Sequence, residues 1–226
     1  MNIEMIRAAA LRLQGHARVT PLLSSPFLDK IAGRRVLVKA ECLQHTGSFK
    51  FRGGWSAVSM LSDEQLMNGV IAYSSGNHAQ GVALAGQLLD VAVTVFMPLD
   101  ASIPKIEATR GYGADVRFHG ATVDEALVEA RAFADETGAV LIHPFDHEHV
   151  VAGQGTLGLE IVDKIPEVKT VVVCTGGGGL LAGVAFAIKQ VKPDVKVVGV
   201  QAEGASTYPA SLEAGEPISR ERMNTM

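Results

Sequence analysis

Three short segments of the chain combine glycine, serine or asparagine with side chains that can react. The first covers residues 46–54 and places Lys50 between Phe49 and Phe51. Burial beside two aromatic rings disfavours an ammonium and lowers an amine pKa that is about 10.4 in water. A neutral amine attacks carbonyl carbon, so this setting suits a lysine that forms a Schiff base. Taken alone, the segment fits an ordinary surface lysine at a helix start slightly better.

The second segment covers residues 73–81 and follows an apolar run; we call its residues 74–78 the serine-asparagine loop. Where a strand leads into a helix, the first backbone N–H groups of the helix lack partners, and with the helix dipole they attract a carboxylate. A serine or asparagine cap would also explain a helix start here. A cap needs one such residue and not a run of five, so the loop predicts a carboxylate-binding site.

The third segment is the tetraglycine loop, residues 176–179, which lies between a valine-rich run and a segment of helical length. Consecutive glycine amides can converge on a phosphate. The lysine and serine or threonine of a G-x-x-x-x-G-K-S/T loop are missing. A loose dinucleotide-binding spacing also fits, through Gly176, Gly178 and Gly183, with Glu203 as the acidic residue that would bind a ribose. The loop therefore predicts a phosphate site without choosing the ligand.

Apolar runs of strand length alternate with segments of helical length from about residue 35 onward. The clearest helix is expected over 122–137, where Leu127 and Ala130 share an apolar face. Thr122 and Glu125 fit a capping box at its start. Repeated strand-helix-strand units predict an α/β fold with parallel sheets and right-handed crossovers. The runs expected as strands are 36–38, 70–73, 91–97, 114–118, 140–142, 171–173 and 195–200.

These runs fall into two groups, 70–118 and 140–200, and no flexible linker separates them. We therefore expect two open parallel-sheet α/β domains, the smaller inserted in the larger, with a ligand cleft between them. The expected limits are 1–62 for the first part of the large domain, 63–139 for the small domain and 140–226 for the second part of the large domain.

The composition is 47% hydrophobic and 5% aromatic, which suits buried parallel sheets. A net charge of −4 without long charged runs argues against a nucleic-acid partner or an anionic membrane surface. Cys42 and Cys174 are far apart and fit buried, reduced thiols. The first fifteen residues do not resemble a signal peptide, and no apolar stretch is long enough to span a bilayer. A cytoplasmic protein is expected.

Together the three segments suit an amino acid joined to a phosphorylated aldehyde. In their residues and order, the segment around Lys50, the serine-asparagine loop and the tetraglycine loop resemble those of fold-type II pyridoxal-phosphate enzymes. The threonine/serine dehydratase and serine racemase family is the most similar branch. The resemblance runs from about Thr20 to Glu203 and implies pyridoxal 5'-phosphate as the cofactor.

The resemblance also implies a role for each motif residue. Lys50 would carry the cofactor as a Schiff base and move the Cα proton. Ser75 stands where serine racemases carry the proton-transfer group for the opposite face of Cα. Ser74, Asn77 and His78 would bind the substrate carboxylate. The other implied cofactor contacts are Phe49 at the ring, Asn77 at the 3-hydroxyl, and Gly176, Gly177, Gly178, Gly179 and Leu180 at the phosphate.

The activity implied by the resemblance is an ammonia-lyase that converts L-threonine or L-serine into a 2-oxo acid and ammonia. Serine racemase, favoured by Ser75, and 3-hydroxyaspartate dehydratase are alternatives with the same chemistry. An α/β nucleotide-binding protein without a Schiff base is the alternative of another class. Since members of the family are usually dimers, we expect a homo-oligomer that acts on a small amino acid and has no nucleic-acid or membrane partner.

No metal site is expected. Residues 143–149 contain three histidines and two acidic residues, but members of the family do not use this segment to bind a metal. Metal-activated members pair a glutamate, here Glu203, with an aspartate six residues later, where this chain has Pro209. A proline side chain cannot be a ligand.

Members of the family also continue well beyond the position of Met226, and their continuation supplies the residue that contacts the pyridine nitrogen. We therefore expect the large domain to be truncated at its C-terminus, with a strand edge left uncovered. An inactive, C-terminally truncated remnant is a further alternative to the enzyme.

Overall fold

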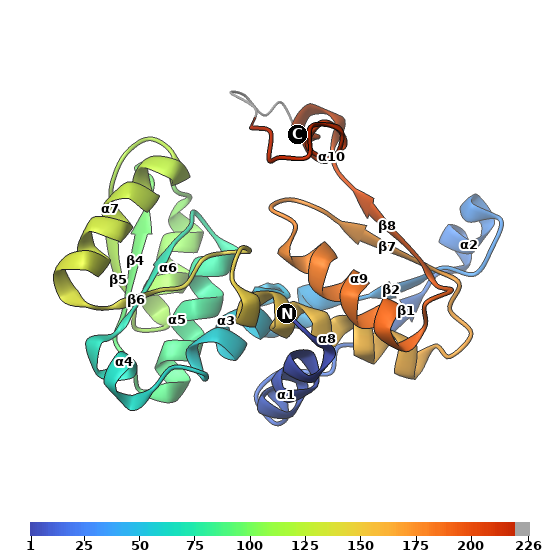
Figure 1. Cartoon of the computed structure of the whole chain (residues 1–226), viewed down its shortest axis with the longest axis horizontal. Helices are drawn as coiled ribbons and strands as arrows, with labels where there is room; N and C mark the ends of the chain where they lie inside the picture. Colours follow the sequence, from blue (N-terminus) through green and yellow to red (C-terminus); the bar gives the residue numbers. More distant parts are fainter. Residues whose placement is uncertain (220–226) are drawn as a thin grey trace.

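The computed structural model describes residues 1–219, and its largest sheet has four parallel strands with helices on both faces. The strands are β3 (Val70–Tyr73), β4 (Val93–Met97), β5 (Asp115–Phe118) and β6 (Val140–Leu141), and the helices are α4 (Asp63–Asn68), α5 (Asn77–Leu89), α6 (Ile103–Gly111) and α7 (Val123–Thr137). The strand order is β5-β4-β3-β6. In Figure 1 this sheet occupies the left of the molecule, with α7 on one face and α5 and α6 on the other.

The central strand β3 is buried along its whole length, which explains its unbroken apolar run. Val70 and Ala72 belong to a core cluster that includes the apolar face of α5. Ile71 and Tyr73 belong to a separate cluster with α7. The alternation of side chains along one strand therefore builds two cores, one on each face of the sheet.

The remaining elements include two separate sheets of two strands each. In one sheet, β7 (Thr170–Cys174) and β8 (Lys196–Val200) pair in parallel. In the other, β1 (Leu22–Ser24) and β2 (Leu37–Lys39) form an antiparallel ribbon. The helices are α1 (Ile3–Leu13), α2 (Pro26–Ala32), α3 (Lys50–Val58), α8 (Glu148–Lys164), α9 (Gly179–Val191) and α10 (Tyr208–Ala214), with 3₁₀ turns at Glu41–Leu43, His45–Gly47 and Glu203–Ala205. Val171 and Val173 of β7 join the core with α8 and α9, whereas Val172 on the other face is 65% exposed.

The α/β class with parallel sheets is confirmed, but the expected grouping of strands is wrong at one place. The run at 140–142 is expected in the group 140–200, and instead Val140 pairs with Val70 of β3. A short apolar run does not encode its partner, and α7 returns the chain to the free edge of β3. The antiparallel pairing of β1 with β2 was not predicted from the sequence. Cys42 and Cys174, expected to be buried, are both exposed. The domain limits stay a prediction, and residues 220–226 of the last range lie outside the described residues.

Helix α3 lies between α5 and α8, and eight of its nine residues are buried. The helix backbones approach closely because a glycine lies at each contact. A Cβ on Gly54 would lie 2.8 Å from the carbonyl oxygen of Gly81, and one on Gly153 would lie 2.5 Å from the carbonyl oxygen of Arg52. These contacts fix α3, and with it Lys50 at its first position, relative to both neighbouring helices (Figure 1).

The close approach of α5 to α3 leads to a testable expectation. A Cβ on Gly81 would lie 2.9 Å from the carbonyl carbon of Lys50, so Gly81→Ala should cost about 1–3 kcal/mol in unfolding free energy through overpacking. Gly111, the last residue of α6, has open space at its Cβ position, and Gly111→Ala should stabilise by about 0.5–1 kcal/mol. Urea unfolding of both variants measures the difference. Equal effects would contradict the proposed contact.

Within residues 1–219, no helix has both the length and the apolar character needed to cross a bilayer. The same residues contain no group of three His, Cys, Asp or Glu side chains arranged to hold a metal ion. Two histidines of segment 143–149 instead bond to backbone: His143 Nδ1 accepts from the N–H of Asp146 at 2.8 Å, and His147 caps α8.

Candidate functional site

The side chain of Lys50 is largely withdrawn from water. Its Nζ donates a hydrogen bond of 2.6 Å to the carbonyl oxygen of Pro144 and lies 5.5 Å from the centroid of the Phe49 ring. Burial lowers the pKa of Lys50 to about 8. A fraction of this amine is therefore neutral near physiological pH, as a nucleophile or a general base requires.

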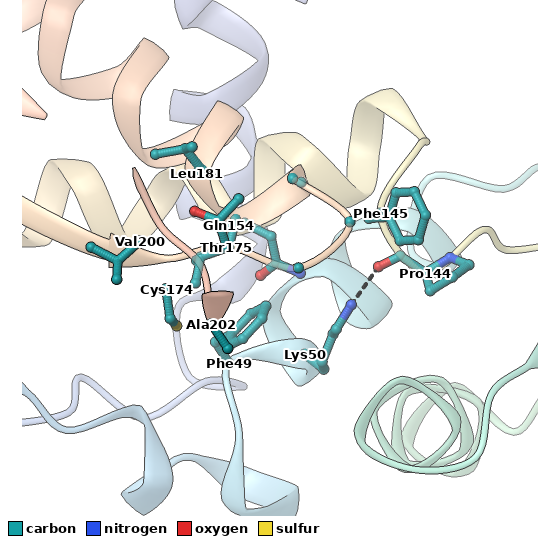
Figure 2. Close-up of a pocket in the computed structure, with 15 residues that line it drawn as sticks. Phe49, Lys50, Pro144, Phe145, Gln154, Cys174, Thr175, Leu181, Val200 and Ala202 are labelled. Carbon is teal, nitrogen blue, oxygen red and sulfur yellow. Dashed lines mark hydrogen bonds between the residues drawn. The ribbon is translucent and has the colours of Figure 1, made fainter. Parts of the chain in front are cut away.

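A cavity of about 330 Å³ has both Lys50 and the tetraglycine loop in its wall. Figure 2 shows Phe49 and Lys50 on one side, the tetraglycine loop across from them, and Gln154 of α8 between the two. The fold thus brings together the first and third segments singled out in the sequence. The other residues that line the cavity are Pro144, Phe145, Cys174, Thr175, Leu180, Leu181, Val200 and Ala202.

The tetraglycine loop leaves no room for side chains at three of its positions, including Gly179, where a Cβ would lie 2.7 Å from the carbonyl oxygen of Phe145. Gly178 caps α9 with a φ of 94°, which residues with a Cβ rarely adopt. A Cβ on Gly177 would lie 2.3 Å from the Phe145 ring, and one on Gly178 would lie 1.6 Å from the hydroxyl of Tyr208. The first N–H groups of α9 have no partner within the helix and lie at the positive end of its dipole. The loop therefore fits a phosphate group.

The serine-asparagine loop begins α5, but none of its residues is in the wall of this cavity. Ser74 and Ser75 are half-buried and Asn77 is exposed. His78 is 2% exposed, and its Nε2 lies 2.8 Å from the carbonyl oxygen of Ile142. Burial lowers the pKa of His78 to about 3, so its ring is neutral. The substrate-binding roles of Ser74, Asn77 and His78, and the proton transfer by Ser75, stay predictions.

The same loop is nevertheless near the lysine helix. Gly81, one turn after Asn77, is where the backbone of α5 contacts that of Lys50. On the other side, the Nζ of Lys105 lies 2.9 Å from the position that a Cβ on Gly76 would occupy. The loop therefore has an ammonium group beside it, which would add to the attraction of a carboxylate. The sequence contained no signal for Lys105, because it belongs to a different helix.

A buried ionic network supports α3 directly behind Lys50. The guanidinium of Arg52 is 1% exposed and donates from Nε and Nη2 to the Glu41 carboxylate, both at 2.9 Å. Its Nη1 donates to Glu160 of α8 at 2.5 Å, and Lys39 also bonds Glu160 at 2.5 Å. Two cations and two anions thus neutralise one another. Arg52 belongs to the first reactive segment, but local sequence assigns it no role, since its partners are distant along the chain.

The lowered pKa of Lys50 has a consequence for stability. In the unfolded chain the lysine pKa is about 10.4, so the folded protein carries the cost of burying an ammonium at every pH below about 8. Between pH 8 and 10.4 the folded state loses this proton first and the cost declines. Lys50→Met should therefore stabilise the protein most below pH 8 and least near pH 10. Urea unfolding at pH 7 and 9.5 measures this, with exposed Lys30→Met as the control. A pH-independent difference would contradict it.

Comparison with known proteins gives a consistent set of similarities. Residues 13–226 match the family described as pyridoxal-phosphate dependent enzymes. The L-threonine ammonia-lyase of Thermotoga maritima is 46% identical over 215 residues, which are 95% of this chain and 54% of that protein. Among solved structures, maize serine racemase has a TM-score of 0.96 and 36% identity, covering 99% of this chain and 68% of that chain. The processed form of threonine deaminase isoform 2 from Solanum lycopersicum has a TM-score of 0.93 and 38% identity, covering 98% of this chain and 61% of that chain. The chain spans somewhat more than half the length of the curated L-threonine ammonia-lyase and L-threonine dehydratase relatives that it matches.

Proposed function

Because this chain belongs to the family of pyridoxal-phosphate dependent enzymes, we propose that it is an ammonia-lyase that converts L-threonine or L-serine into a 2-oxo acid and ammonia. The observation that carries the proposal is a single cavity lined by an amine of lowered pKa and by a glycine loop suited to phosphate. The 46% identity to an L-threonine ammonia-lyase supports threonine as a substrate.

The residues around the cavity fit the cofactor. In the cavity wall, the tetraglycine loop and the start of α9 would hold its phosphate, Phe49 would border its ring, and Lys50 would be its covalent anchor. Asn77, which lies outside that wall, would bond its 3-hydroxyl. When bound, pyridoxal phosphate supplies an electron sink that makes the substrate Cα–H acidic. The protein then decides which bond at Cα is broken, by the side chains that surround it.

Lys50 is the proposed general base. In its neutral form it takes the Cα proton, and a pKa of about 8 leaves both protonation states accessible at neutral pH. Its hydrogen bond to the oxygen of Pro144 holds the amine in place, and Phe49 shields it from water. The β-hydroxyl takes up one proton and leaves as water. The released enamine takes up one water and yields the 2-oxo acid and ammonia.

The serine-asparagine loop would bind the substrate carboxylate through Ser74, Asn77 and His78, with Lys105 adding positive charge. Ser75 supports the second candidate, serine racemase, since a half-buried hydroxyl in this loop could return a proton to the opposite face of Cα. The similarity to maize serine racemase favours the same alternative. The 3-hydroxyaspartate dehydratase alternative differs only at the substrate side chain.

The deciding experiment incubates the protein and pyridoxal phosphate separately with L-threonine, L-serine and 3-hydroxyaspartate. The 2-oxo acid is measured with a coupled dehydrogenase, and the remaining amino acid is resolved by chiral chromatography. The proposal expects 2-oxo acid from threonine or serine with little D-amino acid. Abundant D-serine with little pyruvate would establish the racemase instead. Absence of both products together with absence of cofactor binding would support the inactive remnant.

We further propose a cytoplasmic homodimer. Val172 on β7 and Val200 on β8 are 65% and 50% exposed. These exposed apolar side chains support a contact between this sheet and a second copy of the chain. Light scattering coupled to size exclusion would measure the molar mass. A mass equal to that of one chain at micromolar concentration would contradict the dimer.

A further inference from the structure

Gln154 has no assigned role, yet it is among the most deeply buried polar side chains of the described residues. It is 1% exposed, and neither its Oε1 nor its Nε2 has a hydrogen-bond partner. Leaving both ends of a buried carboxamide unpaired costs free energy, and native proteins rarely accept this cost without a reason. Gln154 also lines the cavity shared by Lys50 and the tetraglycine loop. The unpaired atoms therefore belong to the proposed site.

The fold holds this side chain between two parts of the site. On one side is Gly53 of α3, one turn after Lys50, where a Cβ would lie 2.3 Å from Nε2 of Gln154. On the other side, the next residue of α8, Gly155, contacts α9: a Cβ on Gly183 would lie 2.7 Å from its backbone nitrogen. Figure 2 shows the Gln154 side chain reaching into the space between the tetraglycine loop and Phe49.

We propose that Gln154 is a further cofactor-binding residue, which donates an N–H to the phosphate held by the tetraglycine loop. A carboxamide can present either its NH₂ group or its oxygen to the cavity. A phosphate dianion has acceptors only, so it selects the NH₂ group. The hydrogen bond to an anion would be strong, and unlike a lysine the amide adds no charge that would raise the cost of protonating Lys50. This inference deepens the proposed function and rests on it.

The test compares two aldehydes that differ only in the phosphate. Purified protein without cofactor is titrated with pyridoxal 5'-phosphate and with pyridoxal, and binding is followed by absorbance. Gln154→Met keeps the length of the side chain and removes its polar atoms. It should weaken pyridoxal 5'-phosphate about tenfold and pyridoxal less than about twofold, since one hydrogen bond to an anion is lost. Gln154→Glu, which is isosteric but anionic, should weaken the phosphorylated ligand further. Exposed Gln87→Met should change neither affinity.

Other results would overturn either the role of Gln154 or the proposed function. An equal loss of affinity for both aldehydes in Gln154→Met, or no loss for either, would overturn the phosphate role.

If the unaltered protein binds neither aldehyde, the proposed function fails, and inorganic phosphate then tests Gln154 separately. Phosphate should raise the thermal midpoint of the unaltered protein, and this rise should disappear in Gln154→Met and Gln154→Glu. A rise that persists in both variants, or no rise in the unaltered protein, would overturn the inference. If Gln154→Met does not fold, Gln154→Glu and Gln154→Leu give the same comparison.

Discussion

Replacing Lys50 with alanine is expected to lower the rate of 2-oxo acid formation about 10³-fold or more, because the proposed covalent anchor and the proposed general base are the same amine. No other lysine lies in the wall of the cavity, as far as residues 1–219 define it. Borohydride reduction followed by mass spectrometry gives a second readout. The unaltered protein should retain one pyridoxyl-phosphate group on Lys50, and Lys50→Ala should retain none.

Lys30→Ala is the matched control, because Lys30 is an exposed lysine within α2. Its rate and its borohydride adduct should equal those of the unaltered protein. Retention of the adduct in Lys50→Ala would show that another amine holds the cofactor and would contradict the assignment. A normal adduct on Lys50 with no turnover in the unaltered protein would separate binding from catalysis.

Replacing Arg52 with methionine is expected to lower the unfolding free energy by about 3–5 kcal/mol, the usual effect of removing one partner from a buried ion pair. The change leaves the carboxylates of Glu41 and Glu160 with only Lys39 for compensation. The coupling to the site is direct, since Arg52 is two residues from Lys50 on α3. Urea unfolding gives the free energy, and the pyridoxal phosphate affinity reports on the site.

Arg7→Met provides the control for this loss. Arg7 also pairs with a glutamate, at 2.7 Å, but both side chains are more than half exposed. Exposed pairs contribute about 0.2–1 kcal/mol, so this variant should unfold almost as the unaltered protein does. A stability of Arg52→Met within about 1 kcal/mol of the unaltered protein would show that the buried network contributes little beyond what a methionine of similar volume provides.

Several features of the fold follow from short stretches of sequence. The predicted strands lie near the observed ones, because a buried strand requires a local apolar run and a helix start requires a local cap. Thr122 illustrates the second case: its hydroxyl accepts from the N–H of Glu125 at 3.2 Å, although the Glu125 carboxylate accepts from Ala121 and not from the cap residue. The parallel arrangement also followed, since strands joined through helices pair in parallel.

In the candidate site too, some features could be predicted from local sequence and others could not. Lys50 and the glycines of 176–179 could be recognised from their residue types, because nucleophilic chemistry and phosphate binding depend on local groups. Their meeting in one cavity could not be inferred from local patterns, although a resemblance to known enzymes predicted it. The bond from Lys50 to Pro144 spans 94 positions, and the one from Arg52 to Glu160 spans 108. In the sequence, nothing distinguishes Gln154 from any other polar residue on a helix.

The amino-acid order alone thus settled the chemistry of the groups and the type of each element, which depend on neighbours a few residues apart. The folded chain decided which edge of the sheet receives β6, which carboxylates neutralise Arg52, and that a buried glutamine faces the glycine loop. Such contacts depend on which helix faces meet and how closely glycines let their backbones approach. No local pattern encodes them, because each arises from two segments that meet only when the whole chain is packed.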